Sequence, residues 1–284
     1  DHPPVYEVRR TSDQKLIATL NKPDLSPLIA TGWQKPERFV TKDRNGRHDI
    51  HGVIWRPSNF EKGKKYPVVE NIYAGPHGSF VPKKWSSWAG HKSEMAEGGF
   101  IVVQIDGLGT NYRGRDFHQI AYKNLKDSGF PDRIKWMKAA AAKHPEMDLT
   151  RVGIYGGSAG GQSSTAALLH HGDFYKAAVS DCGCHDNRVD KMWWNEQWLD
   201  WPVNESYVEN SNRTHIPKLQ GQLMLTVGEM DKNVDPSSTY QIVSDLIQAD
   251  KEFTFYMIPN GGHGSGEAPH FRRKRIEFFQ KHLQ

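Results

Sequence analysis

The stretch RVGIYGGSAGGQSSTAALLH, residues 151–170, decides the fold of this chain. Its first part, residues 151–155, is a short apolar run typical of a buried strand, and its last part is rich in Ala and Leu, which favour a helix. Between the two stands Gly156-Gly157-Ser158-Ala159-Gly160, which fits the pattern G-x-S-x-G. A serine at such a strand-to-helix turn is typical of a nucleophile that is presented above a sheet.

This turn restricts which residues can stand in it, for a steric reason. A sharp turn holds the serine in a strained backbone conformation, and side chains beside it would clash, so Gly156 and Gly160 provide clearance. The helix that starts after Ser158 favours negative charge developing in front of its first turn. The alternative is a flexible glycine-rich loop, since isolated matches to the pattern arise by chance. The strand before it and the helix after it favour a nucleophile elbow.

Strand and helix patterns alternate along most of the chain, and the strands are nearly continuously apolar. Such strands are buried on both faces, which is typical of a parallel sheet covered by helices on each side. The sequence therefore predicts an α/β fold of the α/β-hydrolase type with a mostly parallel central sheet. A further helix is predicted directly after Ser158. The other predicted strands are residues 38–42, 49–56, 68–73, 100–106, 176–181, 223–227 and 252–258, and the other predicted helices are residues 86–97, 131–143, 236–249 and 269–283.

The first 37 residues differ from the rest of the chain. They are polar and interrupted by prolines, so we predict an N-terminal extension or linker over residues 1–37, with one strand at residues 5–9. The catalytic domain is predicted to cover residues 38–284. It is expected to open with a hairpin around Asn45-Gly46, a dipeptide typical of tight turns between strands.

Composition limits the classes of protein that fit. Of the 284 residues, 37% are hydrophobic and 25% are charged, with a net charge of +4, which is typical of a soluble globular protein without a membrane span. Residues 272–275 form the densest basic cluster, which we interpret as a solvated face of the last helix and not as a nucleic-acid site. Cys182 and Cys184 are interpreted as small buried residues, because a Cys-x-Cys pair is too tight for an easy disulfide. No metal site and no organic cofactor are predicted.

A serine hydroxyl is a weak nucleophile and needs a base to take its proton. In the α/β-hydrolase fold the chain order is serine, then acid, then histidine. Among the histidines after Ser158, only His263 follows a strand end in a loop of small residues. We interpret His170 and His171 as the end of the helix after the elbow, and His282 as a terminal surface residue. His263 is therefore the predicted base.

The acid is expected in the loop after the strand at residues 223–227. Asp231 is the predicted residue, and it would hold the imidazole in the useful tautomer and stabilise its cation. Glu229 and Asp235 are the alternatives in the same loop. Asp235 also has a structural reading, because it can cap the helix that begins at Pro236.

The tetrahedral intermediate of acyl transfer needs preplaced hydrogen-bond donors. The main-chain N–H of Ala159 is the first predicted donor. Tyr73, at the end of the strand at residues 68–73, is in place to donate its hydroxyl as the second, or it packs at the strand end; position alone leaves both readings open. An apolar acyl-side pocket is expected from an aromatic cluster, with Trp193, Trp194 or Trp198 in its wall, although the same cluster also fits a helix packed on the core.

Several segments resemble one known family in combination. They are Tyr73-Ala74-Gly75-Pro76, Asp106-Gly107 followed by Tyr112-Arg113-Gly114, residues 156–161, Asp231-Lys232-Asn233-Val234 and Gly262-His263-Gly264. With them, residues 38–284 resemble the catalytic domain of the prolyl oligopeptidase family, nearest its dipeptidyl peptidase IV branch. The resemblance implies an oxyanion-binding hydroxyl for Tyr73, the triad acid for Asp231, and substrate contacts for Asn233 and Val234.

The chain also departs from the family pattern. The family's elbow usually carries an aromatic residue where Gly157 stands and a tyrosine where Ala159 stands, which implies a more open S1 pocket and weakens a strict preference for proline. Family members also carry a β-propeller before the hydrolase domain, which restricts access to the site. This chain starts at Asp1 with no methionine, no signal peptide and no propeller. We expect a trimmed product, either a catalytic fragment of a longer protein or a form that has lost its gate.

Three functions follow from these residues. The first is a serine peptidase, with cleavage after proline as one option, acting through an acyl-enzyme. The second is a carboxylesterase or acylaminoacyl hydrolase that uses the same triad on small esters. The third is a non-catalytic binding module on a hydrolase fold, which an intact Ser158, Asp231 and His263 argue against. The predicted partner is accordingly a peptide or small ester substrate.

Overall fold

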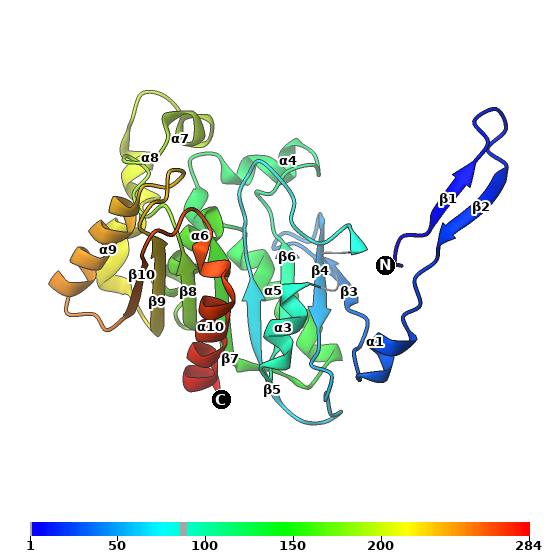
Figure 1. Ribbon diagram of the computed structural model, residues 1–284. Coiled ribbons are helices and arrows are strands. Elements are labelled where there is room, and N and C mark those ends of the chain that lie inside the picture. Colours follow the sequence, from blue (N-terminus) through cyan, green and yellow to red (C-terminus); the bar gives the residue numbers. More distant parts are fainter. Residues whose placement is uncertain (1, 86–89) are drawn as a thin grey trace.

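The computed structural model describes residues 2–85 and 90–284 and is built around one large sheet. The sheet has eight strands in the order β10-β9-β8-β7-β5-β6-β4-β3 (Figure 1). Neighbours from β10 to β6 in this order are parallel, whereas β4 pairs antiparallel with both β6 and β3. The bounds are Glu37–Lys42 for β3, Asp49–Trp55 for β4, Tyr66–Asn71 for β5, Ile101–Asp106 for β6, Met147–Gly157 for β7, Tyr175–Asp181 for β8, Gln222–Gly228 for β9 and Thr254–Ile258 for β10.

Helices cover both faces of this sheet (Figure 1). On one face α3 (His91–Glu97) and α10 (Pro269–Leu283) bury Met95, Phe279 and their neighbours against the strands. On the other face α5 (Phe130–Lys143), α6 (Ala159–His170) and α9 (Pro236–Gln248) bury a larger apolar cluster. This arrangement confirms the predicted α/β-hydrolase fold, and it explains the continuous apolar strands, since every residue of β6 is buried.

The smaller elements gather at one end of the sheet. α4 (Arg115–His118) follows β6, and α7 (Met192–Leu199) and α8 (Glu205–Glu209) follow β8, so all three lie beyond the carboxyl ends of the parallel strands (Figure 1). Short 3-10 helices occur at residues 119–121, 125–127, 212–218 and 265–267. Ligands of open α/β sheets bind at this end, because the loops after the strands converge there.

Most predicted elements differ from the observed ones only at their ends. The strand at residues 151–155 extends over Met147–Gly157, and the predicted hairpin around Asn45-Gly46 forms with the side chain of Asp43 accepting main-chain N–H groups in the turn. Pro131 lies in the first turn of α5, as predicted. The helix predicted at residues 86–97 is observed as α3 from His91, while residues 86–89 lie outside the described residues.

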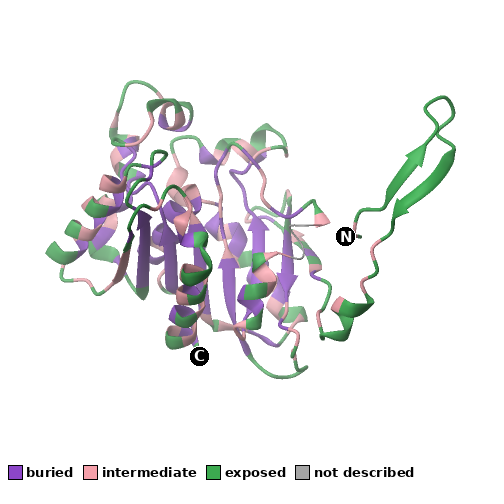
Figure 2. Ribbon diagram, viewed as in Figure 1, coloured by how far each residue is buried: buried purple, intermediate pink, exposed green. Residues whose placement is uncertain are grey.

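The N-terminal region forms a separate hairpin. β1 (Tyr6–Arg9) pairs antiparallel with β2 (Leu16–Asn21), and every residue of both strands is exposed (Figure 2). The short helix α1 (Ser26–Ala30) connects it to the body. A strand within residues 5–9 was predicted, whereas its partner β2 was missed. The assignment of residues 1–37 to an extension and residues 38–284 to the catalytic domain stays a prediction.

The basic cluster at residues 272–275 is not simply a solvated helix face. Arg275 is 5% exposed, and its guanidinium binds the Glu267 carboxylate and lies 4.3 Å from the centre of the Tyr155 ring. Arg272 binds Glu94 of α3 at 2.8 Å. Part of this charge therefore fastens α10 to the body, and the interpretation as a fully solvated face is wrong for Arg275.

Candidate active site

Ser158 stands at the turn between β7 and α6, at the carboxyl end of the parallel strands. Its φ of 58° and ψ of −124° are strained for a residue other than glycine. A side chain at Gly156 or at Gly160 would collide with the main-chain oxygen of Ile72, just beyond β5. Both glycines are therefore required by the close approach of β5, which is the steric demand expected of a nucleophile elbow.

His263 and Asp231 meet after the neighbouring strands. Asp231 follows β9 and His263 follows β10, and the imidazole Nδ1 lies 2.8 Å from Oδ2 of the carboxylate. The Asp231 side chain is fully buried, whereas part of the imidazole reaches solvent. The main chain joins the two loops directly, because the N–H of Met230 donates to the oxygen of Gly261 at 2.8 Å.

The other oxygen of the Asp231 carboxylate is also held. Oδ1 accepts hydrogen bonds from the main-chain N–H groups of Asn233 at 2.8 Å and Val234 at 3.0 Å. These donors fix the carboxylate in one orientation. Asp231 is thus oriented on one side by its own loop and on the other by the imidazole.

The thiol of Cys182 connects this pair to the elbow. Cys182 follows β8, and its sulfur, a carboxylate oxygen of Asp231 and a ring nitrogen of His263 all lie within 4.8 Å of one another. Burial raises the pKa of this thiol, while the main-chain N–H groups of Gly264 and Ser158 act in the opposite direction. The same buried sulfur therefore lies beside the main chain of Ser158 and beside the Asp231–His263 pair, so the three candidate catalytic residues converge at one sheet edge.

The alternative acids have other partners. The Asp235 carboxylate accepts the N–H of Ser237 and caps α9, which agrees with its structural reading. Glu229 accepts the main-chain N–H of Asn260 at 2.9 Å and thereby joins the loops after β9 and β10. Among the alternative bases, His170 and His171 end α6 as expected.

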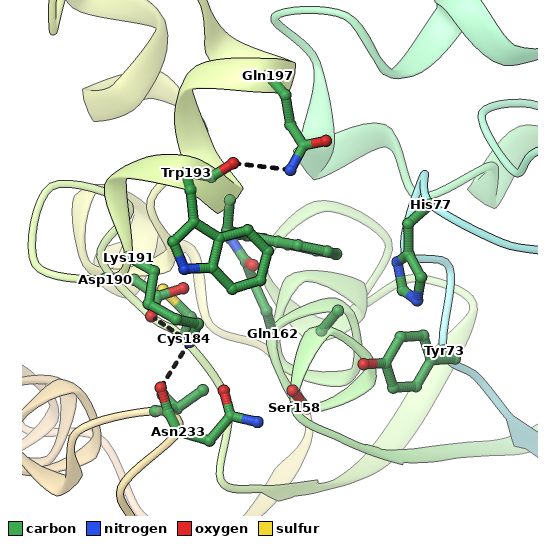
Figure 3. Close-up of a pocket in the computed structure, with 13 residues that line it drawn as sticks. Tyr73, His77, Ser158, Gln162, Cys184, Asp190, Lys191, Trp193, Gln197 and Asn233 are labelled. Atoms are coloured by element: carbon green, nitrogen blue, oxygen red, sulfur yellow. Dashed lines mark hydrogen bonds and ion pairs between the residues drawn. The ribbon is translucent and has the colours of Figure 1, made fainter.

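A cavity of about 380 Å³ opens beside Ser158 (Figure 3). The elbow, the segment after β5, the start of α7 and the loop after β9 all contribute to its wall. Its lining residues are Tyr73, His77, Ser158, Ala159, Gln162, Cys184, Asp190, Lys191, Trp193, Trp194, Gln197, Asn233 and Val234. The cavity is large enough for a few amino-acid side chains.

Tyr73 approaches the serine across this cavity. In Figure 3 its hydroxyl points toward Ser158, and its ring is packed against Phe80, with ring centres 4.7 Å apart. Ala159 is the first residue of α6, so its main-chain N–H has no partner within the helix. A hydroxyl and an N–H are therefore both available where the sequence predicted an oxyanion site.

The tryptophans of α7 divide between two environments. Trp193 and Trp194 line the cavity, and the Trp194 ring lies 5.1 Å from that of His77. Trp198 is 9% exposed and packs with Leu199 in a small apolar cluster. Among the described residues, the cavity wall includes Trp193 and Trp194 but not Trp198, and the predicted substrate contact of these tryptophans stays a prediction.

Polar side chains also line the cavity beside Trp193, which the sequence did not predict. The Asp190 side chain is 6% exposed and its Oδ1 accepts a hydrogen bond from the Lys191 ammonium at 2.9 Å. The Lys191 ammonium also binds the main-chain oxygen of Asn233 at 2.5 Å. Gln162, whose amide donates to Asn187, is another of these polar lining residues. The only sign of these polar lining residues in the sequence was the charged pair Asp190-Lys191 directly before an aromatic helix.

Comparison with known proteins agrees with this geometry. The model of the prolyl oligopeptidase family matches residues 87–284. Human dipeptidyl peptidase 8 is 26% identical over 262 residues, which cover 88% of this chain and 29% of that protein. The probable dipeptidyl-aminopeptidase B of Arthroderma gypseum is 31% identical over 216 residues, covering 74% of this chain and 23% of that protein.

Solved structures show the same architecture. A candidate dipeptidyl aminopeptidase IV of Bacteroides ovatus has a TM-score of 0.88 and 26% identity, over 98% of this chain and 40% of that one. The present chain thus spans less than a third of the length of the curated relatives named here. In the described part of the chain, we find no helix with the length and apolarity that crossing a bilayer requires.

Proposed function

This chain belongs to the prolyl oligopeptidase family, and from that premise we propose that it is the catalytic domain of a serine peptidase that works through an acyl-enzyme. The observation that carries the proposal is the hydrogen bond between His263 and Asp231, at the sheet edge where Ser158 stands on a strained turn. A serine, an imidazole and an orienting carboxylate are the complete set that nucleophilic acyl transfer needs.

The first step is attack by the Ser158 oxygen on the scissile carbonyl carbon. His263 takes the hydroxyl proton on Nε2, because Nδ1 faces Asp231 and carries the proton of that hydrogen bond. The imidazolium then passes this proton to the leaving amine as the carbon–nitrogen bond breaks. Water repeats the sequence on the acyl-enzyme, with His263 again as the base, and releases the acid and the free serine.

Negative charge on the carbonyl oxygen is stabilised by two donors. The hydroxyl of Tyr73 points toward Ser158, and Ala159, whose main-chain N–H has no partner within α6, lines the same cavity. Each donor counts most in the tetrahedral state, because the charge is fully developed there and the donors are already in place. The first turn of α6 adds the positive end of the helix dipole.

The acyl side of the substrate is proposed to occupy the cavity. Trp193 and Trp194 provide a flat apolar wall, and Asn233 and Val234 lie beside the loop that carries the acid. Cleavage after proline remains one option within this proposal. Among the described residues the elbow contributes the small residues Ser158 and Ala159 to the wall, which supports a pocket open to more than one residue type.

A carboxylesterase or acylaminoacyl hydrolase is the second candidate. It would use the same three residues, and the small side chain of Ala159 in the cavity wall favours it. At Gly157 a Cβ atom would lie 3.6 Å from a carboxylate oxygen of Asp181, an ordinary contact distance, so a methyl group would fit there. Small activated esters need few contacts beyond the triad and the oxyanion donors, and such a site would accept them.

A β-propeller in a longer parent chain is proposed to restrict access to the site. Two observations support it: the chain spans 40% of the Bacteroides ovatus structure, and the strands of the N-terminal hairpin expose apolar side chains. Ile17 is 57% exposed and Leu20 is 68% exposed, and exposed apolar side chains that gather in one element are typical of an interaction surface. A propeller packed against this hairpin would bury them.

A two-part experiment tests the proposed function. A fluorophosphonate probe is expected to label the protein, and peptide mapping should place the label on Ser158. Release of chromophore from a Gly-Pro anilide is then compared with release from a short-chain p-nitrophenyl ester. Absence of labelling would contradict the hydrolase and leave a binding module, whereas labelling with ester turnover alone would favour the second candidate.

A further inference from the structure

Lys191 lies where the cavity wall meets the loop of the acid. It precedes α7, and its side chain is 27% exposed. Its ammonium donates hydrogen bonds to two partners, Oδ1 of Asp190 at 2.9 Å and the main-chain oxygen of Asn233 at 2.5 Å. The Trp193 ring lies 6.0 Å away and Cys184 is also nearby. The ammonium thus joins a buried carboxylate of the wall to the main chain of another loop.

The peptide group that Lys191 binds is part of the acid's own support. The carbonyl of Asn233 and the N–H of Val234 belong to the same planar peptide unit. Its carbonyl accepts from the ammonium, and its N–H donates to Oδ1 of Asp231 at 3.0 Å. Oδ2 of the same carboxylate accepts from His263 at 2.8 Å. Hydrogen bonds therefore run without a break from the ammonium to the imidazole.

A cation on a peptide oxygen strengthens the donor at the other end of that peptide. Hydrogen bonds in a chain polarise one another, and bonds to charged groups are roughly twice as strong as neutral ones. The ammonium also holds the peptide plane at one angle, which aims the Val234 N–H at the carboxylate. Because Oδ1 is then fixed, Oδ2 is directed at the ring of His263.

We propose that Lys191 is a positioning residue that holds the triad acid in its working orientation through the peptide unit between Asn233 and Val234. This rests on the proposed function, since it assigns a role within the same triad. Asp190 keeps the Lys191 ammonium in place through its hydrogen bond of 2.9 Å. Lys191 also lines the cavity. A substrate bound there would contact its side chain, and through the same hydrogen bonds its binding would be coupled to the orientation of Asp231.

The side chain of Lys191 is not needed to build α7. The helix is started by the main-chain oxygen of Lys191, which accepts the N–H groups of Trp194 and Asn195 at 3.1 Å each. A substitution at this position leaves those bonds intact. Loss of the ammonium alone would leave the Asp190 carboxylate unpaired and buried, so the informative variant removes both charges.

The test compares the double variant Asp190→Asn/Lys191→Met with Lys191→Arg. The double variant keeps the local net charge and removes the link to the peptide. We expect kcat to fall about ten- to a hundredfold on a small ester, the loss appropriate to one charge-assisted hydrogen bond. The downfield proton resonance of the His263 Nδ1–H is expected to shift or broaden. Lys191→Arg keeps both the charge and the donors and should restore most of kcat.

A matched control removes a similar pair elsewhere on α7. Lys123 and Asp200 form an ion pair of 2.8 Å at the end of this helix, away from the acid loop. Asp200→Asn/Lys123→Met should leave both kcat and the proton resonance as in the wild type. The ionisable neighbours Asp181 and Cys182 are the same in all variants, so the comparison isolates the ammonium.

The readouts separate this inference from the proposed function. If the wild-type protein is neither labelled by a fluorophosphonate nor active, the proposed function fails. If the wild type is active and the folded double variant keeps the wild-type kcat and an unchanged resonance, the role of Lys191 is overturned. Should the double variant have a lowered urea midpoint, its proton resonance measured without urea, where it is folded, decides, and an unchanged resonance overturns the role.

Discussion

The main-chain N–H of Ser158 donates a hydrogen bond of 2.9 Å to the main-chain oxygen of Asp181. This bond ties the elbow to the end of β8, so the strained serine is held by the sheet as well as by α6. Strain of this kind costs about 1–3 kcal/mol and persists only where its surroundings over-determine it. The glycines around the serine are part of those surroundings, since they let β5 and β8 approach.

Gly160→Ala and Gly157→Ala should therefore differ sharply. A Cβ atom at Gly160 would collide with the carbonyl of Ile72, whereas at Gly157 the nearest atom would be 3.6 Å away. We expect Gly160→Ala to lose about 1–3 kcal/mol of unfolding free energy and most of its fluorophosphonate labelling. Gly157→Ala should keep both. Urea unfolding and labelling rates measure the two effects, and equal behaviour of the variants would contradict this account of the elbow.

Asp231→Asn should abolish most activity without unfolding the protein. The main-chain N–H groups of Asn233 and Val234 would hold the amide oxygen of the new side chain, because they need an acceptor. Its NH₂ group would then face Nδ1 of His263 and force the wrong tautomer, which leaves Nε2 protonated. We expect a loss in kcat of about ten-thousandfold, measured on the better of the two chromogenic substrates. Ser158→Ala, with an expected loss on the order of a millionfold, is the reference for complete loss. A variant at residue 231 with near-normal kcat would show that another group orients the base.

Tyr73→Phe tests the second oxyanion donor. The substitution removes only the hydroxyl, so the ring contact with Phe80 at 4.7 Å is retained and the fold should not change. We expect kcat to fall about a hundred- to a thousandfold with little effect on KM, because the donor acts mainly on the tetrahedral state. Steady-state kinetics on the ester separates the two constants. Wild-type kcat would assign Tyr73 a packing role at the strand end.

Local signals made the centre of the site predictable from the sequence. The elbow requires Gly156 and Gly160 because any side chain there would collide with the main chain. Asp235 directly before a helix start has the pattern of an N-cap, and its side chain does cap α9. His263 was singled out by its place in a glycine-rich loop after a strand. Each of these inferences depends on residues that are close together in the chain.

Contacts between distant segments were not predictable in this way. The link from Lys191 to Asn233 joins residues 42 positions apart, and no local pattern marks it. Trp194 and Trp198 are the same residue type on the same helix. Only their contacts with distant segments determine that Trp194 lines the cavity and that Trp198 is buried in an apolar cluster. β2 was missed because its short apolar run stands in a stretch interrupted by prolines, which favoured an irregular extension.

A buried histidine below the cavity predicts how stability depends on pH. His185 is 0% exposed, and its Nδ1 lies 3.1 Å from the amide nitrogen of Asn212, which donates to it. A proton on Nδ1 would therefore meet another donor. Burial lowers the pKa of His185 from the ordinary 6.5 to about 3. The folded protein keeps this ring neutral under conditions in which the unfolded chain binds a proton.

The sign of the effect follows from linkage. Between pH 6.5 and about 3 the unfolded state binds more protons at His185, so its contribution to stability is complete above pH 6.5 and is lost as the pH falls toward 3. We expect the unfolding free energy to fall by up to about 1.4 kcal/mol per pH unit from this residue. His170, whose pKa burial lowers to about 4, adds to the slope in the same direction. Urea unfolding of His185→Gln should show a shallower slope than the wild type, whereas His270→Gln, at an exposed position of α10, should keep the wild-type slope. If the unfolding free energy of His185→Gln falls with decreasing pH as steeply as that of the wild type, groups other than His185 cause the acid sensitivity.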